Sequence, residues 1–429
     1  MRITLFAHGT RGDVWPMVAL GWHLAACDHD VTVAVPNEFR AFTEQAGLRT
    51  APLPLDLMAW LGTSEGQRLL FRGGVPVLRG IAREYSRHAS AFDDACEAAA
   101  AGAEALVASM FTLDRAQALG DLLRIPVAMV YQQPVAPSRE YSSTLLTKGR
   151  LRPRFLRRAS GDLAYRIWWH GNSKATYAFR RKLGLPARSR PTFFRIRDHG
   201  AVMLHTFSPS LFPRPTDWTD SLKVTGAWQM PAPLRSCVGE DLPADLQAWL
   251  DAGDPPVFLG FGSMPVLDPQ PLLDDIIGVT TELGLRAVVS ENCVSQDFAE
   301  TLPDQLRVVG SLDHDRLFPQ CAAVVHHGGL GSTTASLRAG RPTMVCSVFG
   351  DQPWWGEHMR RLGVGTHVPF RKLDRGTLES GLCTLLDPDV TACANTLGAA
   401  MQAEGDGLPA AAQLLEDWLV VAEPTPVLL

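Results

Sequence analysis

The chain has 429 residues, of which 46% are hydrophobic and 20% are charged, and its formal net charge at pH 7 is −5. This length and composition favour two or three globular domains, and the acidic balance gives no general reason to expect a nucleic-acid partner. The eight cysteines show neither metal-site nor redox spacing. The N-terminus lacks the layout of a signal peptide, and no apolar run reaches the length of a membrane span. We therefore expect a reduced, cytoplasmic protein.

Short apolar runs alternate with helical patterns along the whole chain, which predicts parallel sheets with crossover helices. In the first half the expected strands are 3–7, 31–35, 105–108, 126–130 and 202–205, with helices over about 15–27 and 116–123. In the second half the expected strands are 257–260, 286–289, 307–309, 323–326 and 343–346. The pattern predicts an α/β protein of two Rossmann-like domains that face each other across a cleft.

A proline-rich stretch between the two halves predicts the domain boundary. We expect an N-terminal domain over 1–215, a linker over 216–256 and a C-terminal domain over 257–408. Residues 409–429 are predicted to form a helix and tail, and the apolar side chains of that helix predict that it docks back on the N-terminal domain.

The segment 148–197 departs from the average charge of the chain, because it holds fifteen Lys or Arg residues and the single acid Asp162. One interpretation is a solvated helical face whose long side chains cover apolar surface. The other is a surface that contacts an anionic membrane or a phosphorylated acceptor. Nucleic acid is less favoured, because no nucleic-acid-binding motif accompanies the charge.

The most informative motif is the run from Val324 to Thr334, in which an apolar strand enters a turn rich in glycine and hydroxyl groups. A helix that starts in such a turn leaves backbone N–H groups unpaired, with the positive end of the helix dipole behind them. Phosphate is a common occupant of that kind of site. His327 adds a donor, and Ser332 and Thr333 add hydroxyl groups.

A second motif follows the next predicted strand, where Asp351 and Gln352 stand side by side before Trp354 and Trp355. A carboxylate next to an amide suits a ligand covered in hydroxyl groups. A phosphate site together with a polyol site suggests a nucleotide sugar.

Three separated motifs carry a resemblance to a known family: Gly9 to Val14 with Pro16, His326 to Thr334, and Gly350 to Gly356. In their order and spacing they resemble the family 1 glycosyltransferases of the GT-B fold. The similarity is to the branch that holds sterol glucosyltransferases and bacterial antibiotic glycosyltransferases. The resemblance implies inverting sugar transfer to an acceptor hydroxyl, without a metal or other cofactor and with the nucleotide sugar as co-substrate. It also implies that the donor binds the second domain and the acceptor the first.

Inverting transfer needs a base that takes the acceptor proton. Asp13 lies in the loop after the first predicted strand, at the carboxyl edge of the sheet, where ligands of α/β sheets bind. The antibiotic branch of the family has this Asp, whereas plant relatives have a His. The alternative is a helix N-cap. Arg11 either orients Asp13 or contacts the diphosphate, and His8 is more simply a satisfied structural donor than a second titrating group.

The resemblance assigns the remaining donor contacts to named positions. The diphosphate is expected at His327, Gly329, Gly331, Ser332, Thr333, Ser263 and Arg11, the sugar at Asp351 and Gln352, and the nucleoside base at the backbone of Leu312. Trp354 and Trp355 either cover the sugar or acceptor with an apolar face or pack in the core. Ala335 stands where plant relatives have a ribose-binding Glu, which leaves uridine and thymidine diphosphate sugars both open.

Three other functions fit parts of the pattern. A dehydrogenase needs Gly-x-Gly-x-x-Gly directly after a strand, and the turn from Gly9 to Gly12 lacks that spacing. A sugar-nucleotide epimerase of the same fold would use the donor cleft without a lipophilic pocket, and a catalytically silent homologue would act as a helper. We expect the partners to be a nucleotide sugar and a lipophilic natural-product or sterol-like acceptor. Peripheral membrane contact through 148–197 stays open.

Overall fold

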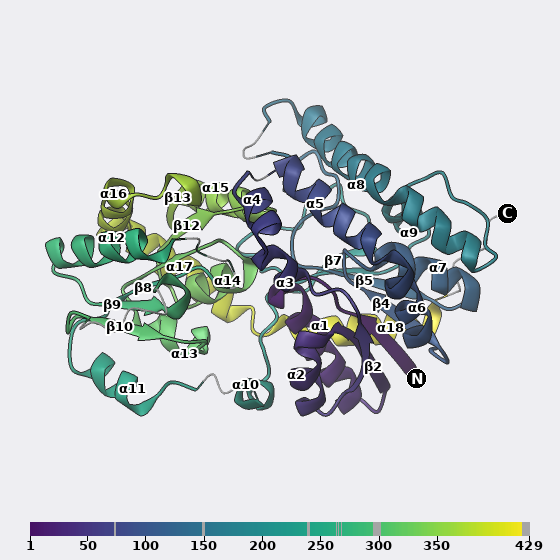
Figure 1. The fold of residues 1–429 in the computed structure, drawn as a ribbon, viewed down its shortest axis with the longest axis horizontal. Helices are drawn as coiled ribbons and strands as arrows, with labels where there is room; N and C mark the ends of the chain where they lie inside the picture. The colour runs from purple at the N-terminus through teal and green to yellow at the C-terminus, as the bar shows by residue number, and fades with distance from the viewer. Residues whose placement is uncertain are drawn as a thin grey trace. The chain divides into compact units, whose positions relative to one another are not determined.

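The structure is a computed structural model that describes residues 1–72, 74–147, 151–237, 241–262, 264, 266, 268–294 and 302–422. The chain divides into two compact units. Unit 1 comprises Met1–Trp60, Gly74–Cys237 and Gly405–Leu429, and unit 2 comprises Leu61–Gly73 and Val238–Glu404. Figure 1 shows a sheet covered by helices in each unit. The predicted α/β class with two parallel sheets is confirmed.

Unit 1 is built on seven parallel strands in the order β3-β2-β1-β4-β5-β6-β7. Their bounds are β1 Arg2–Phe6, β2 Asp30–Pro36, β3 Arg49–Leu53, β4 Ala105–Ala108, β5 Val127–Tyr131, β6 Met203–His205 and β7 Leu222–Val224. The helices of this half are α1 Arg11–Ala26, α2 Arg40–Gln45, α3 Leu57–Gly62, α5 Gly74–Arg87, α6 Ala89–Ala100, α7 Leu113–Leu123, α8 Arg154–Lys182, α9 Thr192–Asp198, α10 Ala232–Cys237 and α18 Gly407–Val421, with the short turn η1 Asn37–Phe39. Buried apolar runs form the four central strands β1, β2, β4 and β5.

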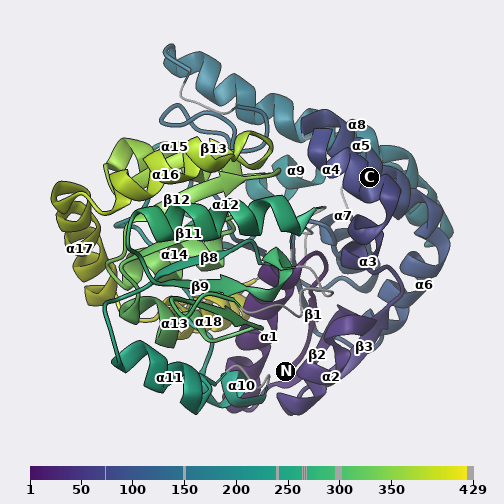
Figure 2. The same cartoon turned by 60° about the vertical axis from the view of Figure 1, so that its left-hand side comes forward.

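Unit 2 is built on six parallel strands in the order β10-β9-β8-β11-β12-β13, which Figure 2 brings forward. Their bounds are β8 Val257–Gly260, β9 Ala287–Ser290, β10 Leu306–Val309, β11 Ala323–His326, β12 Thr343–Ser347 and β13 Gly365–Pro369. The helices are α4 Ser64–Arg72, α11 Ala244–Asp251, α12 Pro269–Glu282, α13 His314–Leu317, α14 Leu330–Arg338, α15 Gln352–Leu362, α16 Arg375–Leu385 and α17 Pro388–Ala403, with the short turns η2 Glu291–Cys293, η3 Phe318–Gln320 and η4 Phe370–Lys372.

Both sheets have the same topology, in which the first strand lies inside the sheet and the chain builds outward to each side of it. The strand order therefore reverses between β1 and β4 in unit 1, and between β8 and β11 in unit 2. Open α/β sheets bind their ligands outside the carboxyl ends of the strands at such a reversal. The fold thus predicts one ligand-binding edge in each unit.

Two segments bear on the domain prediction. Strand β7, within the predicted linker, belongs to unit 1, and α11, later in the same stretch, belongs to unit 2. The last helix, α18, packs against α1, and Nε2 of His29 lies 2.8 Å from a carboxylate oxygen of Glu416.

None of the helices within the described ranges is long and apolar enough to cross a bilayer.

A buried ionic cluster ties three helices of unit 1 together. The Asp121 carboxylate, on α7, has no exposed surface. It accepts hydrogen bonds from Arg180 on α8 at 2.6 Å, from Arg195 on α9 at 3.1 Å and from Gln117 at 2.9 Å. Two guanidinium groups and an amide thus compensate the desolvation of one carboxylate, which is the condition for burying charge without a large cost.

Replacement of Asp121 by Asn should therefore destabilise the protein by about 3–5 kcal/mol, because two buried guanidinium groups lose their counter-charge. The urea unfolding midpoint measures this loss. The matched control is Asp94→Asn, which removes a carboxylate from an exposed pair with Lys182 and should cost less than about 1 kcal/mol. Equal midpoint shifts for the two variants would contradict a structural role for the cluster.

Candidate functional site

The turn between β11 and α14 presents unpaired backbone donors. Helix α14 starts at Leu330 after the N-cap Gly329, and no side chain in the described part of the chain caps it. The first turn of a helix has no intrahelical partners for its N–H groups, so the amides of Leu330, Gly331 and Ser332 point outward with the helix dipole behind them. This end of α14 lies at the carboxyl end of β11, beside the strand reversal of unit 2.

The imidazole of His327 occupies a space that two glycines leave open. A Cβ added to Gly329 would lie 2.5 Å from Nε2 of His327, and one added to Gly262 would lie 2.8 Å from its Cε1. Gly262 follows β8 and has a φ of +60°, which a side chain would strain. The glycine-rich turns after two neighbouring strands thus fix the position of one histidine ring.

Burial lowers the pKa of His327 to about 4, with a smaller contribution from the nearby His314. The ring is therefore neutral at pH 7 and carries one N–H donor. Its Nδ1 is buried and has no hydrogen-bond partner among the described residues. An unpaired buried polar atom is costly, and Nδ1 of His327 is thus a hydrogen-bonding position that the described residues leave unused.

His326 has a different role from His327. It is buried at the end of β11, and its Nδ1 accepts a hydrogen bond from the Gly328 N–H at 2.9 Å. Burial lowers its pKa well below the usual range, and the nearby His327 and His314 add to this effect. His326 therefore shapes the turn and stays neutral.

The hydroxyl groups at the start of α14 are not equivalent. Thr333 is fully buried, and its Oγ1 donates to the Gly329 carbonyl at 3.0 Å. This hydrogen bond stabilises the turn. The predicted hydrogen bond from the Thr333 hydroxyl to a diphosphate is therefore wrong, because the hydroxyl proton is donated to the Gly329 carbonyl. Ser332 is half-buried, and its hydroxyl shows no hydrogen bond within the described ranges. A Cβ on Gly331 would meet nothing within 4 Å, so space is open above this residue.

The acid and amide that follow β12 are held by their own turn. Oδ2 of Asp351 accepts from the indole N–H of Trp355 at 2.9 Å. Oε1 of Gln352 accepts from the backbone N–H groups of Val348 at 2.8 Å and Phe349 at 3.2 Å. Both side chains therefore have fixed orientations before a ligand binds.

The two tryptophans lie in the core of unit 2. Trp355 is fully buried, and Trp354 is 8% exposed with its ring stacked on His358 at 5.3 Å between centroids. The prediction that Trp355 covers a ligand needs correction, because a side chain without exposed surface positions Asp351 instead. Core packing was the alternative for both residues, and burial favours it.

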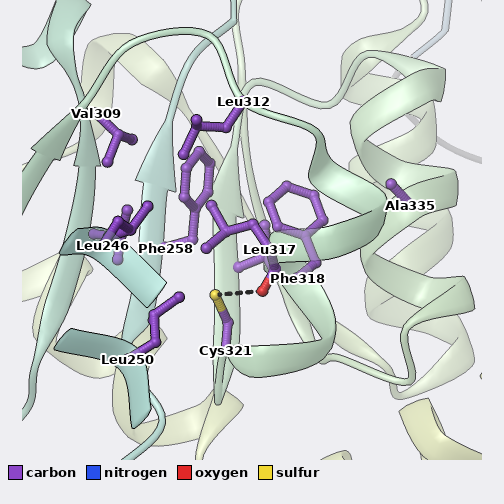
Figure 3. Close-up of a cluster of buried hydrophobic side chains, with 11 residues drawn as sticks. Leu246, Leu250, Phe258, Val309, Leu312, Leu317, Phe318, Cys321 and Ala335 are labelled. Atoms are coloured by element: carbon purple, nitrogen blue, oxygen red, sulfur yellow. Dashed lines mark hydrogen bonds between the residues drawn. The ribbon is translucent and has the colours of Figure 1, made fainter. Parts of the chain in front are cut away.

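Leu312 lies between β10 and α13, with its side chain in a cluster that also holds Phe258, Leu317 and Phe318 (Figure 3). The cluster anchors this loop at the carboxyl edge of the sheet, and Cys321 adds a contact from its Sγ to the Leu317 carbonyl at 3.5 Å. The predicted donor residue Ser263 lies outside the described residues.

In unit 1, Asp13 lies in the first turn of α1, which starts at Arg11 and not near Trp15 as expected. Thr10 is the N-cap, and Oδ2 of Asp13 accepts from the Thr10 N–H at 2.8 Å and its hydroxyl at 3.0 Å. The carboxylate packs directly on Gly9, whose φ is +134° and where any side chain would collide with it. Asp13 therefore does help to cap the helix. It does so as the third helical residue (N3) of the capping box, and Thr10 is the N-cap residue.

Capping leaves the second oxygen of this carboxylate available, because Oδ1 of Asp13 shows no hydrogen bond in the described structure. Desolvation of the carboxylate by burial raises the pKa of Asp13 to about 6, although the hydrogen bonds from Thr10 oppose the shift. The side chain keeps some exposure to solvent. A partly accessible carboxylate with this pKa can take a proton near neutral pH.

The guanidinium group of Arg11 lies over the ring of Trp15, with its central carbon 3.5 Å from the ring centroid. The Trp15 ring in turn stacks on Phe42 at 5.0 Å. This stacking holds the guanidinium at the start of α1 by a cation–π contact.

Sequence reasoning missed the contact between His8 and Tyr85, which joins β1 to α5. Nε2 of His8 lies 2.8 Å from the Leu55 carbonyl, which can only accept, so Nδ1 accepts the Tyr85 hydroxyl at 2.5 Å. Burial lowers the pKa of His8 to about 4. Both ring nitrogens are used, so His8 is the satisfied structural donor. No spacing in the sequence signals this pair.

Aromatic side chains continue along the carboxyl edge of the unit 1 sheet. Phe111, after β4, stacks on Tyr85 at 6.0 Å and meets Trp168 at 5.8 Å between centroids. Beside them is a cavity of about 20 Å³. It is lined by Met110, Leu113, Asp114, Tyr131, Tyr165, Trp168, Trp169, Pro191, Thr192 and Phe193. Across the described ranges, no three His, Cys, Asp or Glu side chains are grouped so that they could hold a metal ion.

The geometry around His327 gives a direct test. Gly329→Ala should weaken the binding of uridine or thymidine diphosphate about tenfold or more, because the new Cβ displaces the imidazole and a charge-assisted hydrogen bond is lost. The backbone at Gly329 (φ −62°, ψ 144°) accepts Ala. Gly376→Ala, where the nearest atom is 3.8 Å away, is the control. Calorimetry measures both, and unchanged affinity in Gly329→Ala would remove His327 from the site.

Two family models match the chain. Residues 3–122 match the glycosyltransferase family 28 N-terminal domain, and residues 272–416 match the C-terminal domain of erythromycin biosynthesis protein CIII-like proteins. The chain is similar to solved structures of the glycotransferase of kitacinnamycin (19% identity, TM-score 0.70, 97% of this chain and 98% of that chain). It is also similar to the spinosyn rhamnosyltransferase SpnG in complex with thymidine diphosphate (21% identity, TM-score 0.64, 97% and 100%). These structures establish the GT-B fold.

Curated relatives extend over almost the whole chain. An uncharacterized glycosyltransferase of Mycobacterium leprae is 30% identical over 423 residues, which are 97% of this chain and 97% of the relative. Sterol 3-beta-glucosyltransferase UGT80A2 of Arabidopsis thaliana is 30% identical over 422 residues, which are 96% of this chain and 64% of the plant protein. The chain therefore belongs to the family 1 glycosyltransferases of the GT-B fold, and it is a glycosyltransferase.

Proposed function

We propose that the protein transfers a sugar from a uridine or thymidine diphosphate sugar to a hydroxyl of a lipophilic acceptor, with inversion and without a metal or other cofactor. The observation that carries this proposal is the uncapped start of α14 beside the neutral ring of His327. The names of two relatives support it: a sterol 3-beta-glucosyltransferase and a rhamnosyltransferase whose structure holds thymidine diphosphate.

The diphosphate binds at the start of α14 in this proposal. The amides of Gly331 and Ser332 and the hydroxyl of Ser332 donate to phosphate oxygens, and the helix dipole favours their negative charge. The neutral ring of His327 donates one further hydrogen bond. A bound dianion stabilises the protonated ring and so raises the pKa of His327 toward neutrality, which helps the ring to offset the charge of the departing diphosphate.

Asp351 and Gln352 bind the sugar. The Asp351 carboxylate is oriented by the indole N–H of Trp355 and accepts a hydrogen bond from a sugar hydroxyl. The backbone turn holds Oε1 of Gln352, so the amide N–H groups are the donors that this side chain offers to the sugar. This pair orients the anomeric carbon relative to the diphosphate.

Asp13 is the base. The acceptor oxygen attacks the anomeric carbon from the face opposite the diphosphate, its proton passes to Oδ1 of Asp13, and the bond to the diphosphate breaks with its electron pair on the phosphate oxygen. One displacement of this kind inverts the anomeric carbon. The aromatic edge formed by Phe111 and Trp168 supplies an apolar surface for the acceptor.

Asp13→Asn separates catalysis from capping, because the amide oxygen still accepts the Thr10 N–H while the base is lost. We expect transfer to fall by about 100-fold or more, with unchanged binding of the nucleoside diphosphate and an unchanged melting temperature. Mass spectrometry of products from uridine and thymidine diphosphate glucose with a panel of hydrophobic alcohols measures transfer. Undiminished turnover in this variant would exclude Asp13 as the base.

The pKa of Asp13 predicts the pH dependence of the reaction. A base must be deprotonated, so kcat/KM should rise with pH through about 6 and level off above it. Thr10→Val removes a hydrogen bond that stabilises the charged carboxylate, so this limb should move to higher pH. A pH profile of both proteins checks the shift. A limb that stays in place in Thr10→Val would show that another group titrates.

A further inference from the structure

The basic segment 148–197 divides into two parts with different surroundings. Five of its basic side chains between residues 180 and 197 pair with acids of unit 1. The pairs are Arg180 and Arg195 with Asp121, Lys182 with Asp94 and Glu97, and Arg190 and Arg197 with Asp198. Five of the seven basic side chains in this C-terminal part are thus paired with acids of unit 1.

The first two thirds of α8 present a different surface. One side of the helix is exposed and carries side chains at a spacing of three or four residues, which places them on a single face. We call these residues the outer face of α8: Phe155, Leu156, Ala159, Leu163, Arg166, Ile167, His170 and Lys174. The opposite side is buried, and in Figures 1 and 2 α8 is the long helix beside α5.

The outer face of α8 is unusually apolar for exposed surface. Phe155 is 69% exposed, Leu163 is 51% exposed, and Leu156 and Ile167 are each 40% exposed. These are four of the eleven large hydrophobic side chains that are exposed among the described residues, and they fall within thirteen consecutive positions. A contiguous exposed apolar strip of this kind marks an interaction surface.

Cations stand on and beside this strip without acidic partners. Arg166 and Lys174 lie on the outer face and Arg158 borders it, and none of the three forms an ion pair within the described ranges. The sequence from 152 to 174 has only one acid, Asp162. A chain with net charge −5 therefore concentrates unpaired positive charge where it also exposes apolar side chains.

The inner side of α8 holds the helix firmly on unit 1. Gly161 allows the closest approach, because a Cβ there would lie 2.9 Å from Cα of Pro137. Arg157 turns inward and donates to the backbone carbonyl groups of Leu151 and Arg152. The outer face is thus presented by a helix whose orientation is fixed.

We propose that the outer face of α8 is a docking surface for an anionic membrane. Aliphatic and aromatic side chains in one strip with Arg and Lys are the composition of a helix that lies in the interface plane of a bilayer, where cations meet acidic headgroups. This occupant matches the face in both charge and polarity, whereas a solvated face explains only the charge. This inference rests on the proposed function, because the lipophilic acceptor proposed there concentrates in membranes.

Vesicle co-sedimentation of the full chain tests the surface without any measurement of transfer. The probes are phosphatidylcholine vesicles with and without about one third phosphatidylserine. We expect binding only to the anionic vesicles. Arg158→Gln/Arg166→Gln/Lys174→Gln should weaken it about 100-fold, since each cation near an anionic surface contributes about fivefold. Phe155→Gln/Leu163→Gln/Ile167→Gln should weaken it about tenfold or more.

Two controls match these variants. Val420→Gln/Val421→Gln removes exposed apolar side chains from α18, and Arg360→Gln/Arg361→Gln/Arg375→Gln removes the same charge from unit 2. Both should bind as the unchanged protein does, and transfer to a water-soluble acceptor should be normal in all four variants. No binding by the unchanged protein, or equal binding by all variants, would overturn the proposal. So would a dimer in solution that the apolar variant converts to monomer.

Discussion

The pairing of β11 with β8 is the contact on which the proposed donor site depends. Their register sets His326 opposite Gly260, so the turns that follow the two strands meet at the strand reversal of the sheet. There the ring of His327 fits between Gly262 and Gly329, at the start of α14. Neither turn alone would hold the imidazole. The hydrogen-bonded pairing of the two strands therefore fixes the position of the His327 ring so closely that a single added methyl group would displace it.

The sheet of unit 1 has the same topology as that of unit 2, but different side chains lie at the carboxyl ends of its strands. The first turn of α1, which follows β1, carries Asp13, and its carboxylate lies against Gly9 because Thr10 anchors one oxygen. Capping and proton transfer are compatible in one side chain, since the cap uses Oδ2 and leaves Oδ1. The capping box thus fixes the carboxylate that we propose as the base, which would lower the entropic cost of reaching the reactive geometry.

Burial acts on the two central groups in opposite directions. It raises the pKa of Asp13 to about 6 and lowers the pKa of His327 to about 4. In both cases burial favours the neutral form of the side chain over the charged form, because desolvation penalises charge of either sign. This result suits each proposed role, because a higher pKa makes the Asp13 carboxylate a stronger base and the lower pKa keeps the His327 imidazole uncharged at pH 7.

The sequence by itself determined the central strands, their parallel arrangement and the turns that carry Asp13, His327 and Asp351, because buried strands need apolar runs and tight turns need glycine. The strands β3, β7 and β13 were not predicted, and all three lie at sheet edges, where half-exposed strands lack such runs. Only the tertiary structure decided that the Thr333 hydroxyl is used internally and that Trp355 is buried. It also decided which basic residues of 148–197 find acids and which face outward, because those contacts join segments far apart in the chain.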